Sequence, residues 1–122
     1  MTSRTRLAAG ITLAAALTLV VGAATPASAA VAGCAYPYVC FYPTYAEYSA
    51  GHPVSRYRDV TDGWQYLRSQ SVGADYIYNS RNDDVAYLHF TNDTVECLRP
   101  HELQNWNEKQ VDRVRIDSSD TC

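Results

Sequence analysis

The sequence has little positive charge. Lys109 is its one lysine, and its ten lysines and arginines are set against thirteen aspartates and glutamates, which gives a formal net charge of −3. An acidic surface repels phosphate groups, so nucleic acids are poor partners for such a chain. We therefore expect no nucleic-acid partner.

The motifs of common hydrolases and zinc sites are also missing. No H-E-x-x-H, G-x-S-x-G or C-x-x-C occurs, although hydrolytic nucleophiles and metal ions depend on such spacings. On its predicted strand, His89 is expected to be an exposed polar residue rather than a catalyst, and Glu47 and Glu96 have no recognisable partner. We therefore expect no enzymatic activity, no metal and no cofactor. The histidines are scattered at positions His52, His89 and His101.

Long apolar runs are absent except near the N-terminus. Arg4 and Arg6 precede an apolar stretch over residues 7–24, and the small residues Ala27-Ser28-Ala29 follow it. This order is typical of a cleavable signal peptide, which we place at residues 1–30. The apolar stretch approaches the length of a membrane span, so an uncleaved anchor is the alternative. Export predicts a secreted, extracellular protein with no membrane association after cleavage.

The remaining residues, 31–122, are 92 in number, which suits a single small domain with a modest core. Without Arg4 and Arg6 the formal charge of this part is −5. We expect it to be monomeric.

All four cysteines lie in the exported part, where an oxidising compartment favours disulfides. Four cysteines allow three pairings. Because Cys34 and Cys40 flank one short loop, we favour a bond between them, which leaves Cys97 with Cys122. The other two pairings stay open at this point.

Short runs rich in aromatic and β-branched residues, separated by turn formers, predict an all-β domain. Alternation is clearest where Ala86, Leu88 and Phe90 share one face, and where Val114 and Ile116 do so. One turn of helix is expected in each of the segments 63–67 and 101–106. The predicted strands are 39–42, 56–60, 75–78, 85–90, 94–98 and 111–116.

The two tryptophans suggest an internal repeat. Trp64 and Trp106 are 42 residues apart, and similar aromatic strands precede each of them. Two units of about forty residues would each be too small to bury an apolar face alone, so they would pack together as a sandwich around the tryptophans. Coincidence among the aromatics of a tyrosine-rich chain is the alternative.

A set of motifs occurs in a fixed order along residues 31–122. The motifs are Cys34-x5-Cys40-Phe41-Tyr42, Tyr48 and Gly51, Trp64 with Leu67, Tyr76 to Asn79, Cys97-Leu98-Arg99-Pro100, and Val114-Arg115-Ile116. Their order resembles that of the secreted actinobacterial peptidase inhibitors of βγ-crystallin type, peptidase inhibitor family thirty-six, whose members include metalloproteinase inhibitors. The resemblance implies a βγ-crystallin-like double Greek-key sandwich and an extracellular protease as partner.

The chain departs from that pattern in two ways. The spacing from Tyr42 to Gly51 is two residues longer than usual, and the second unit has no glycine in the matching place. At the positions where crystallin domains bind calcium, the chain has Val72 and Lys109. The valine side chain offers no oxygen ligand, and the lysine ammonium group repels the calcium ion. We expect no tight calcium site.

The resemblance also points to a reactive segment. Cys97 and Leu98 match the family's inhibitory loop, in which a rigid, disulfide-held segment offers an apolar residue to a thermolysin-like protease. The alternative is that Leu98 belongs to the core and Cys97 only ties the fold.

A second binding surface is predicted from clustered tyrosines, which give a large, stiff contact area with a hydroxyl group. Such a surface fits carbohydrate or protein, so a glycan- or cell-wall-binding module is the rival function, and a small toxin-like effector of the same fold is another. Packing in the core is the alternative role for about half of these side chains. They are Tyr36, Tyr38, Tyr42, Tyr45 and Tyr48.

Overall fold

The structure is a computed structural model that describes Gly22 and residues 30–122. The predicted signal peptide at residues 1–30 therefore lies almost wholly outside the described residues.

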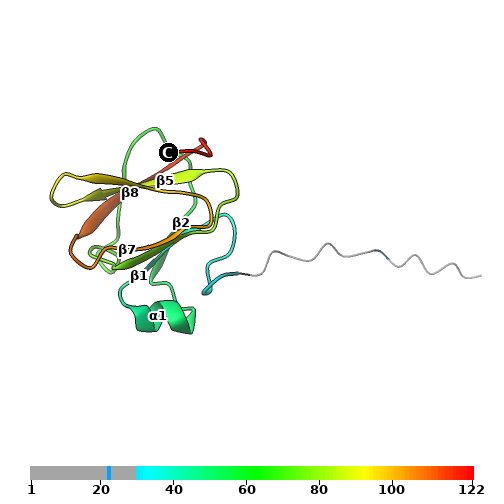
Figure 1. Cartoon of the computed structure of the whole chain (residues 1–122), viewed down its shortest axis with the longest axis horizontal. Coiled ribbons are helices and arrows are strands. Elements are labelled where there is room, and N and C mark those ends of the chain that lie inside the picture. Colours follow the sequence, from blue (N-terminus) through cyan, green and yellow to red (C-terminus); the bar gives the residue numbers. More distant parts are fainter. Residues whose placement is uncertain (1–21, 23–29) are drawn as a thin grey trace, which may run out of the picture.

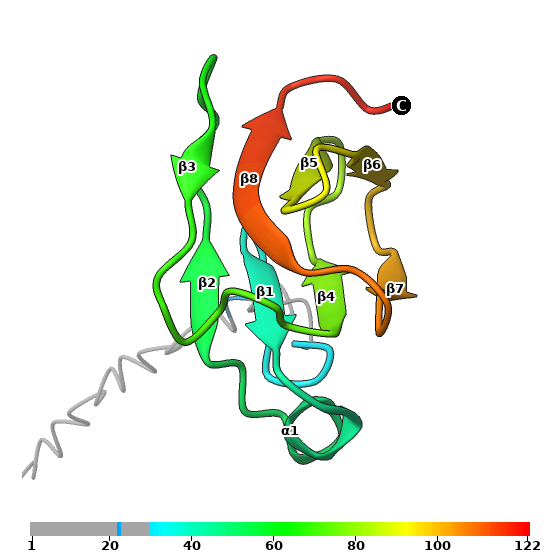
Figure 2. The ribbon, with the colours of Figure 1, turned by 90° about the vertical axis from the view of Figure 1, so that its left-hand side faces the viewer.

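Within residues 30–122, eight strands form two four-stranded antiparallel sheets that face each other in two layers (Figures 1 and 2). The first sheet has the order β2-β1-β4-β7 and the second the order β3-β8-β5-β6. The prediction of an all-β fold is confirmed. The strands are β1 (Val39–Tyr42), β2 (Ser55–Tyr57), β3 (Gln65–Tyr66), β4 (Tyr76–Asn79), β5 (Val85–Phe90), β6 (Val95–Leu98), β7 (Leu103–Asn105) and β8 (Val111–Asp117).

The two halves of the chain are interleaved. The first half comprises β1 to β4 and the second half β5 to β8, and corresponding strands of the two halves occupy corresponding positions. The third strand of each half, however, lies in the sheet formed by the other half. Thus β3 pairs with β8, and β7 pairs with β4. Because each sheet contains strands from both halves, neither half can complete a sheet alone.

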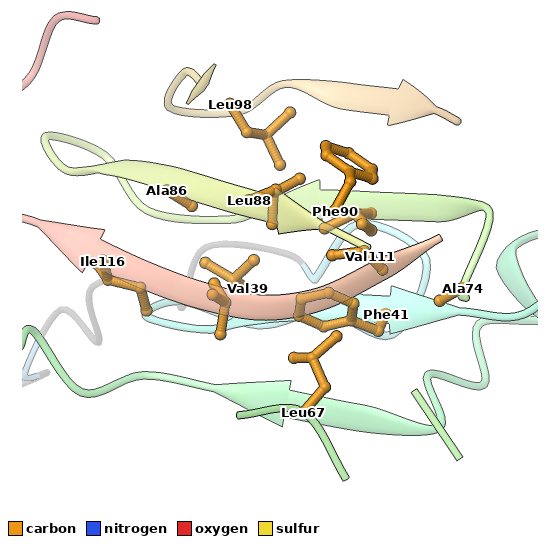
Figure 3. Packing of buried hydrophobic residues seen from close by; sticks show 12 residues of the cluster. Val39, Phe41, Leu67, Ala74, Ala86, Leu88, Phe90, Leu98, Val111 and Ile116 are labelled. Atoms are coloured by element: carbon orange, nitrogen blue, oxygen red, sulfur yellow. The ribbon is translucent and has the colours of Figure 1, made fainter. Parts of the chain in front are cut away.

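The core lies between the sheets, where inward side chains from both are fully buried (Figure 3). Val39 and Phe41 come from β1, and the predicted face of Ala86, Leu88 and Phe90 comes from β5. The alternation in β8 is confirmed as well, since both of its predicted core residues are fully buried. Strand periodicity in the sequence therefore identified the core face correctly.

A second, smaller cluster covers the outer face of the first sheet. Cys40 and Tyr42 of β1 point to this side and are buried together with Cys34 and Tyr78. The segment before β1 closes over them, and the Tyr42 hydroxyl donates a hydrogen bond to the Ala32 carbonyl at 2.7 Å. The half-buried tyrosines of the predicted binding surface pack against this cluster, as the packing alternative anticipated.

One helix, α1 (Tyr45–Ala50), lies between β1 and β2 and was not predicted from the sequence. Thr44 caps its N-terminus in a capping box with Glu47, and Gly51 ends it in a left-handed conformation. Gly33 lies so close that a Cβ on it would be 2.1 Å from the Gly51 carbonyl oxygen, so only glycine fits there. The helix occupies most of the spacing between Tyr42 and Gly51.

Two expectations about local structure were wrong. The segments predicted as helical turns at 63–67 and 101–106 contain strands β3 and β7, because edge pairing with β8 and β4 supplies partners that an isolated turn would lack. Trp106 packs against the core, but Trp64 lies on the outer side of the second sheet, against His89. The core is therefore not built around both tryptophans.

Both favoured disulfides are present. Cys34 bonds to Cys40 and Cys97 bonds to Cys122, and no cysteine is left free. Disulfides are typical of proteins that fold in an oxidising compartment, so this pairing agrees with an extracellular location.

Candidate binding surfaces

The predicted reactive segment does not form an exposed loop. Leu98 is the last residue of β6, is completely buried and points into the core near Leu88 and Phe90 (Figure 3). Cys97 pairs across the sheet with Tyr87. The geometry therefore matches the alternative role, in which Leu98 packs in the core and Cys97 ties the C-terminus to β6.

Only part of the predicted tyrosine surface is accessible. Tyr42 is fully buried and Tyr38 is half-buried, while Tyr36 and Tyr45 are 51% and 61% exposed. Tyr45 on α1 gathers with Tyr48 and with a residue that the sequence reasoning left out, Tyr76 of β4. We call these three side chains, Tyr45, Tyr48 and Tyr76, the tyrosine platform.

The rings of the tyrosine platform are in mutual contact. The Tyr45 centroid lies 6.1 Å from that of Tyr48 and 5.7 Å from that of Tyr76, and Tyr48 and Tyr76 stack at 6.2 Å with 17° between their planes. Tyr48 also meets buried Tyr42 edge to face at 5.3 Å. The platform thus rests on the smaller cluster, which holds the rings in place.

A hollow of about 410 Å³ opens beside the platform, in the connection from β7 to β8. Asn105 lines it and is also the cross-strand partner of Tyr76, so the hollow and the platform meet at this residue. The Trp106 indole contributes an aromatic wall and packs on Phe90 at 5.6 Å. The rest of the lining is polar or charged, namely Asn107, Glu108 and Lys109.

The prediction that His89 is an exposed polar residue was wrong. It is buried, with 8% of its surface exposed, and its Nδ1 atom lies 2.6 Å from Oδ1 of Asp112. The register between β5 and β8 shifts after His89, so that Phe90 pairs with Val111 and Asp112 is the extra residue. Such a bulge redirects a side chain, and here it brings Asp112 to the imidazole. The contact was not readable from the sequence because it depends on this shift.

The two glutamates also have partners that the sequence did not reveal. Glu96 accepts a hydrogen bond from Lys109 Nζ at 2.8 Å. The Glu47 carboxylate accepts one from the backbone amide of Thr44 at 3.1 Å and another from the Thr44 hydroxyl. The Thr44 side chain, and then the backbone amides, lower the pKa of Glu47 below its ordinary value of 4.5. The position of Glu47 three residues after Thr44 is the sequence pattern that could have revealed this contact.

Burial governs the tyrosine hydroxyls beneath the platform. Desolvation, reinforced by nearby Tyr48, raises the pKa of Tyr42 to about 12. The same causes raise the pKa of Tyr78 above its ordinary value. A tyrosine hydroxyl is already neutral at neutral pH, so the raised pKa extends the hydrogen bond from Tyr42 to Ala32 into more alkaline solution.

Two features are absent from the described residues. Residues 30–122 hold no group of three or more histidine, cysteine, aspartate or glutamate side chains arranged to bind a metal ion. In the same part of the chain, no helix has the length and apolar character needed to cross a membrane.

Comparison with known proteins does not assign a family. No family model matches the chain, and neither a curated protein nor a solved structure is significantly similar to it.

Proposed function

We propose that this chain is a secreted, non-catalytic recognition protein with the double Greek-key architecture of βγ-crystallin domains, and that it binds glycans through the tyrosine platform. The architecture is supported by the equivalent strand order of the two halves and the exchange of their third strands. The sequence motifs that resemble the peptidase-inhibitor family fall in the same order along the chain.

The observation that carries the glycan proposal is the exposed ring of Tyr45 set against two further tyrosines. A sugar ring offers a face of C–H groups, which packs well on an aromatic ring, and hydroxyl groups at its edge that need hydrogen-bond partners. The platform supplies the rings and their hydroxyls. Asn105, exposed beside Tyr76, supplies an amide that both donates and accepts.

The adjoining hollow extends this surface. Its volume of about 410 Å³ falls in the range of small-molecule sites, and its lining combines one indole with amide and charged groups. Such a mixture suits a saccharide, which has both an apolar face and a polar edge. The proposed site therefore runs from Tyr45 to the hollow at Trp106.

A pull-down of the purified protein on insoluble polysaccharides, namely bacterial cell wall, chitin and cellulose, tests this function. We expect one of them to retain the protein, and Tyr45→Ala to weaken retention about tenfold, a loss equivalent to about 1.4 kcal/mol. Tyr45→Phe keeps the ring and should retain most of the binding.

Tyr66→Ala provides the matched control. Tyr66 is 73% exposed but lies in β3 of the second sheet, away from the platform. Retention on none of the polysaccharides, or equal losses from Tyr45→Ala and Tyr66→Ala, would refute glycan binding at the platform.

Protease inhibition is the second candidate, supported by the resemblance of the sequence motifs. With Leu98 buried, inhibition requires a surface other than that side chain. Incubation with a thermolysin-type metalloprotease tests it, and full protease activity at micromolar protein would exclude it. Leu98→Asp is not a useful variant, because a carboxylate in the core would unfold the protein.

A further inference from the structure

The outer face of the second sheet carries two arginines among aromatic rings. Arg113 and Arg115 of β8 point outward, because their neighbours Val114 and Ile116 are fully buried in the core. Tyr87 pairs directly with Arg115, and Tyr66 pairs with Arg113. We call this set, Trp64, Tyr66, Tyr87, Arg113 and Arg115, the arginine–aromatic face.

The guanidinium of Arg115 is held between two rings. Its central carbon lies 4.8 Å from the Tyr87 centroid and 5.4 Å from the Trp64 centroid. Both distances are within the range of cation–π attraction. Within residues 30–122, no carboxylate oxygen lies within 4 Å of Arg115, and its buried Nε atom has no hydrogen-bond partner. The charge of Arg115 is therefore not neutralised inside the described protein.

The positive charge of Arg113 is only weakly compensated by acidic groups. Its guanidinium carbon lies 4.9 Å from the Tyr66 centroid, and its Nε atom is 3.6 Å from Oδ2 of Asp112, beyond hydrogen-bond distance. The other oxygen of Asp112 is engaged by His89 at 2.6 Å. About 29% of the Arg113 side chain is exposed to solvent.

Two other cations in the described part of the chain have direct acidic partners. Arg81 pairs with Asp84, and Lys109 pairs with Glu96. Arg115 differs from both, although residues 31–122 contain more acidic than basic side chains and offer many candidate partners. An arginine fixed by rings but lacking a carboxylate is preorganised for one supplied from outside, since little side-chain entropy remains to be lost.

We propose that the arginine–aromatic face binds an acidic segment of an extracellular partner protein, with a carboxylate of the partner accepting hydrogen bonds from the Arg115 guanidinium. Tryptophan, tyrosine and arginine are the residues that dominate binding energy in protein interfaces. Val95, the cross-strand partner of His89, adds an apolar side chain that is 49% exposed. This surface is separate from the tyrosine platform, which lies on the first sheet.

Charge favours a short acidic segment over a polyanion. Two arginines can satisfy one or two carboxylates, whereas a long sulfated or phosphorylated polymer would also meet the excess of acidic side chains elsewhere on the protein. The apolar and aromatic neighbours of the arginines would in turn contact the side chains that flank the carboxylates. The partner chemistry is therefore glutamate or aspartate interspersed with apolar residues.

The test uses the whole purified protein and a short peptide of alternating glutamate and leucine, with the same peptide bearing glutamine as control. Binding is followed by calorimetry and by NMR of the arginine Nε–H groups, whose burial slows proton exchange. We expect the glutamate peptide to bind at least tenfold more tightly than the glutamine peptide and to shift the Arg115 signal. Arg115→Gln should weaken binding about tenfold, and Arg113→Gln less.

Arg68→Gln is the control variant, because Arg68 is exposed and lies outside this face. The proposal is overturned if Arg115→Gln and Arg68→Gln bind the peptide equally, or if the two peptides bind alike. It is also overturned if neither peptide binds at millimolar concentration, or if a sulfated polysaccharide or inorganic sulfate binds more tightly than the peptide. Tyr45→Ala should leave peptide binding unchanged.

Discussion

The two sheets have equivalent strand orders but very different outer faces. In the first sheet, the segment before β1 and the helix α1 cover the outward side chains, so that Cys40 and Tyr42 are fully buried. In the second sheet, Arg113, Arg115 and the rings around them remain partly exposed. The shared strand order builds one common core, while each outer face depends on what lies next to it.

The connections between the first two strands of each half account for much of this difference. Between β1 and β2 the chain forms the capped helix α1, which brings Tyr45 and Tyr48 to the first sheet. Between β5 and β6 it makes only a tight turn, with Asp93 in a left-handed conformation. A longer connection therefore adds a covering layer and, with it, the tyrosine platform.

The largest expected effect tests whether both sheets depend on one core. Phe41 in β1 and Phe90 in β5 occupy corresponding strands and are both fully buried. We expect Phe41→Ala and Phe90→Ala each to lower the free energy of unfolding by about 3–5 kcal/mol, measured by urea denaturation. A loss below about 1 kcal/mol for either variant would show that the sheets do not share the core equally.

Removal of each disulfide provides the next comparison between the two regions. The Cys97–Cys122 bond closes 25 residues and the Cys34–Cys40 bond closes 6. A longer loop loses more entropy when it is closed in the unfolded chain. We therefore expect replacement of both Cys97 and Cys122 by alanine to lower the free energy of unfolding by about 3–4 kcal/mol, and replacement of both Cys34 and Cys40 to lower it by about 2–3 kcal/mol. Thermal unfolding measures both, and the reverse order would mean that packing around Cys34 and Cys40 outweighs chain entropy.

Alkaline titration probes the covered face of the first sheet. The pKa of Tyr42 is about 12 in the folded protein, against 10.0 when unperturbed. The unfolded chain therefore loses this proton first, and the stabilising contribution, complete below pH 10, declines as the pH rises toward 12. Unfolding measured across this range should show the decline in the native protein. Tyr42→Phe should remove that part of the pH dependence, and an unchanged profile would contradict the assignment.

The smallest effect concerns the helix. Thr44→Ala removes the N-cap of α1, and we expect it to cost about 1 kcal/mol, with faster amide exchange in α1 than in β5. Because the folded pKa of Glu47 is lowered, its stabilising contact is present above its ordinary pKa of 4.5 and is lost as the pH falls through the folded value. Thr44→Ala should weaken that acid dependence. Equal protection of α1 in the variant and the native protein would show that packing alone maintains the helix.

The sequence predicted most strands because each carries its own local signal. The ranges 39–42 and 85–90 match β1 and β5 residue for residue, since aromatic or alternating apolar residues are bounded there by turn formers. Strands β3 and β7 were missed because they have two and three residues and exist through pairing with the opposite half's strands. The helix α1 was missed although its capping box, Thr44 with Glu47, is visible in the sequence.

The candidate sites were less accessible to sequence reasoning. A motif could single out Leu98 but could not tell that its side chain points inward. Tyr76 is 31 residues from Tyr45 along the chain, and only sheet pairing and the position of α1 bring the rings together. The exposed surfaces thus combine residues that no local pattern connects.

By itself, the sequence determined the all-β class and the inward faces of the long strands, and it favoured the pairing of the nearest cysteines that the structure shows. Alternation and short loop closure are local properties of the chain, so they can be read without knowing the fold. The tertiary structure alone decided the exchange of β3 and β7, the burial of His89 and the grouping of Arg115 with Trp64 and Tyr87. These features arise because strand register and long-range pairing set which side chains become neighbours, and distant parts of the sequence fix both.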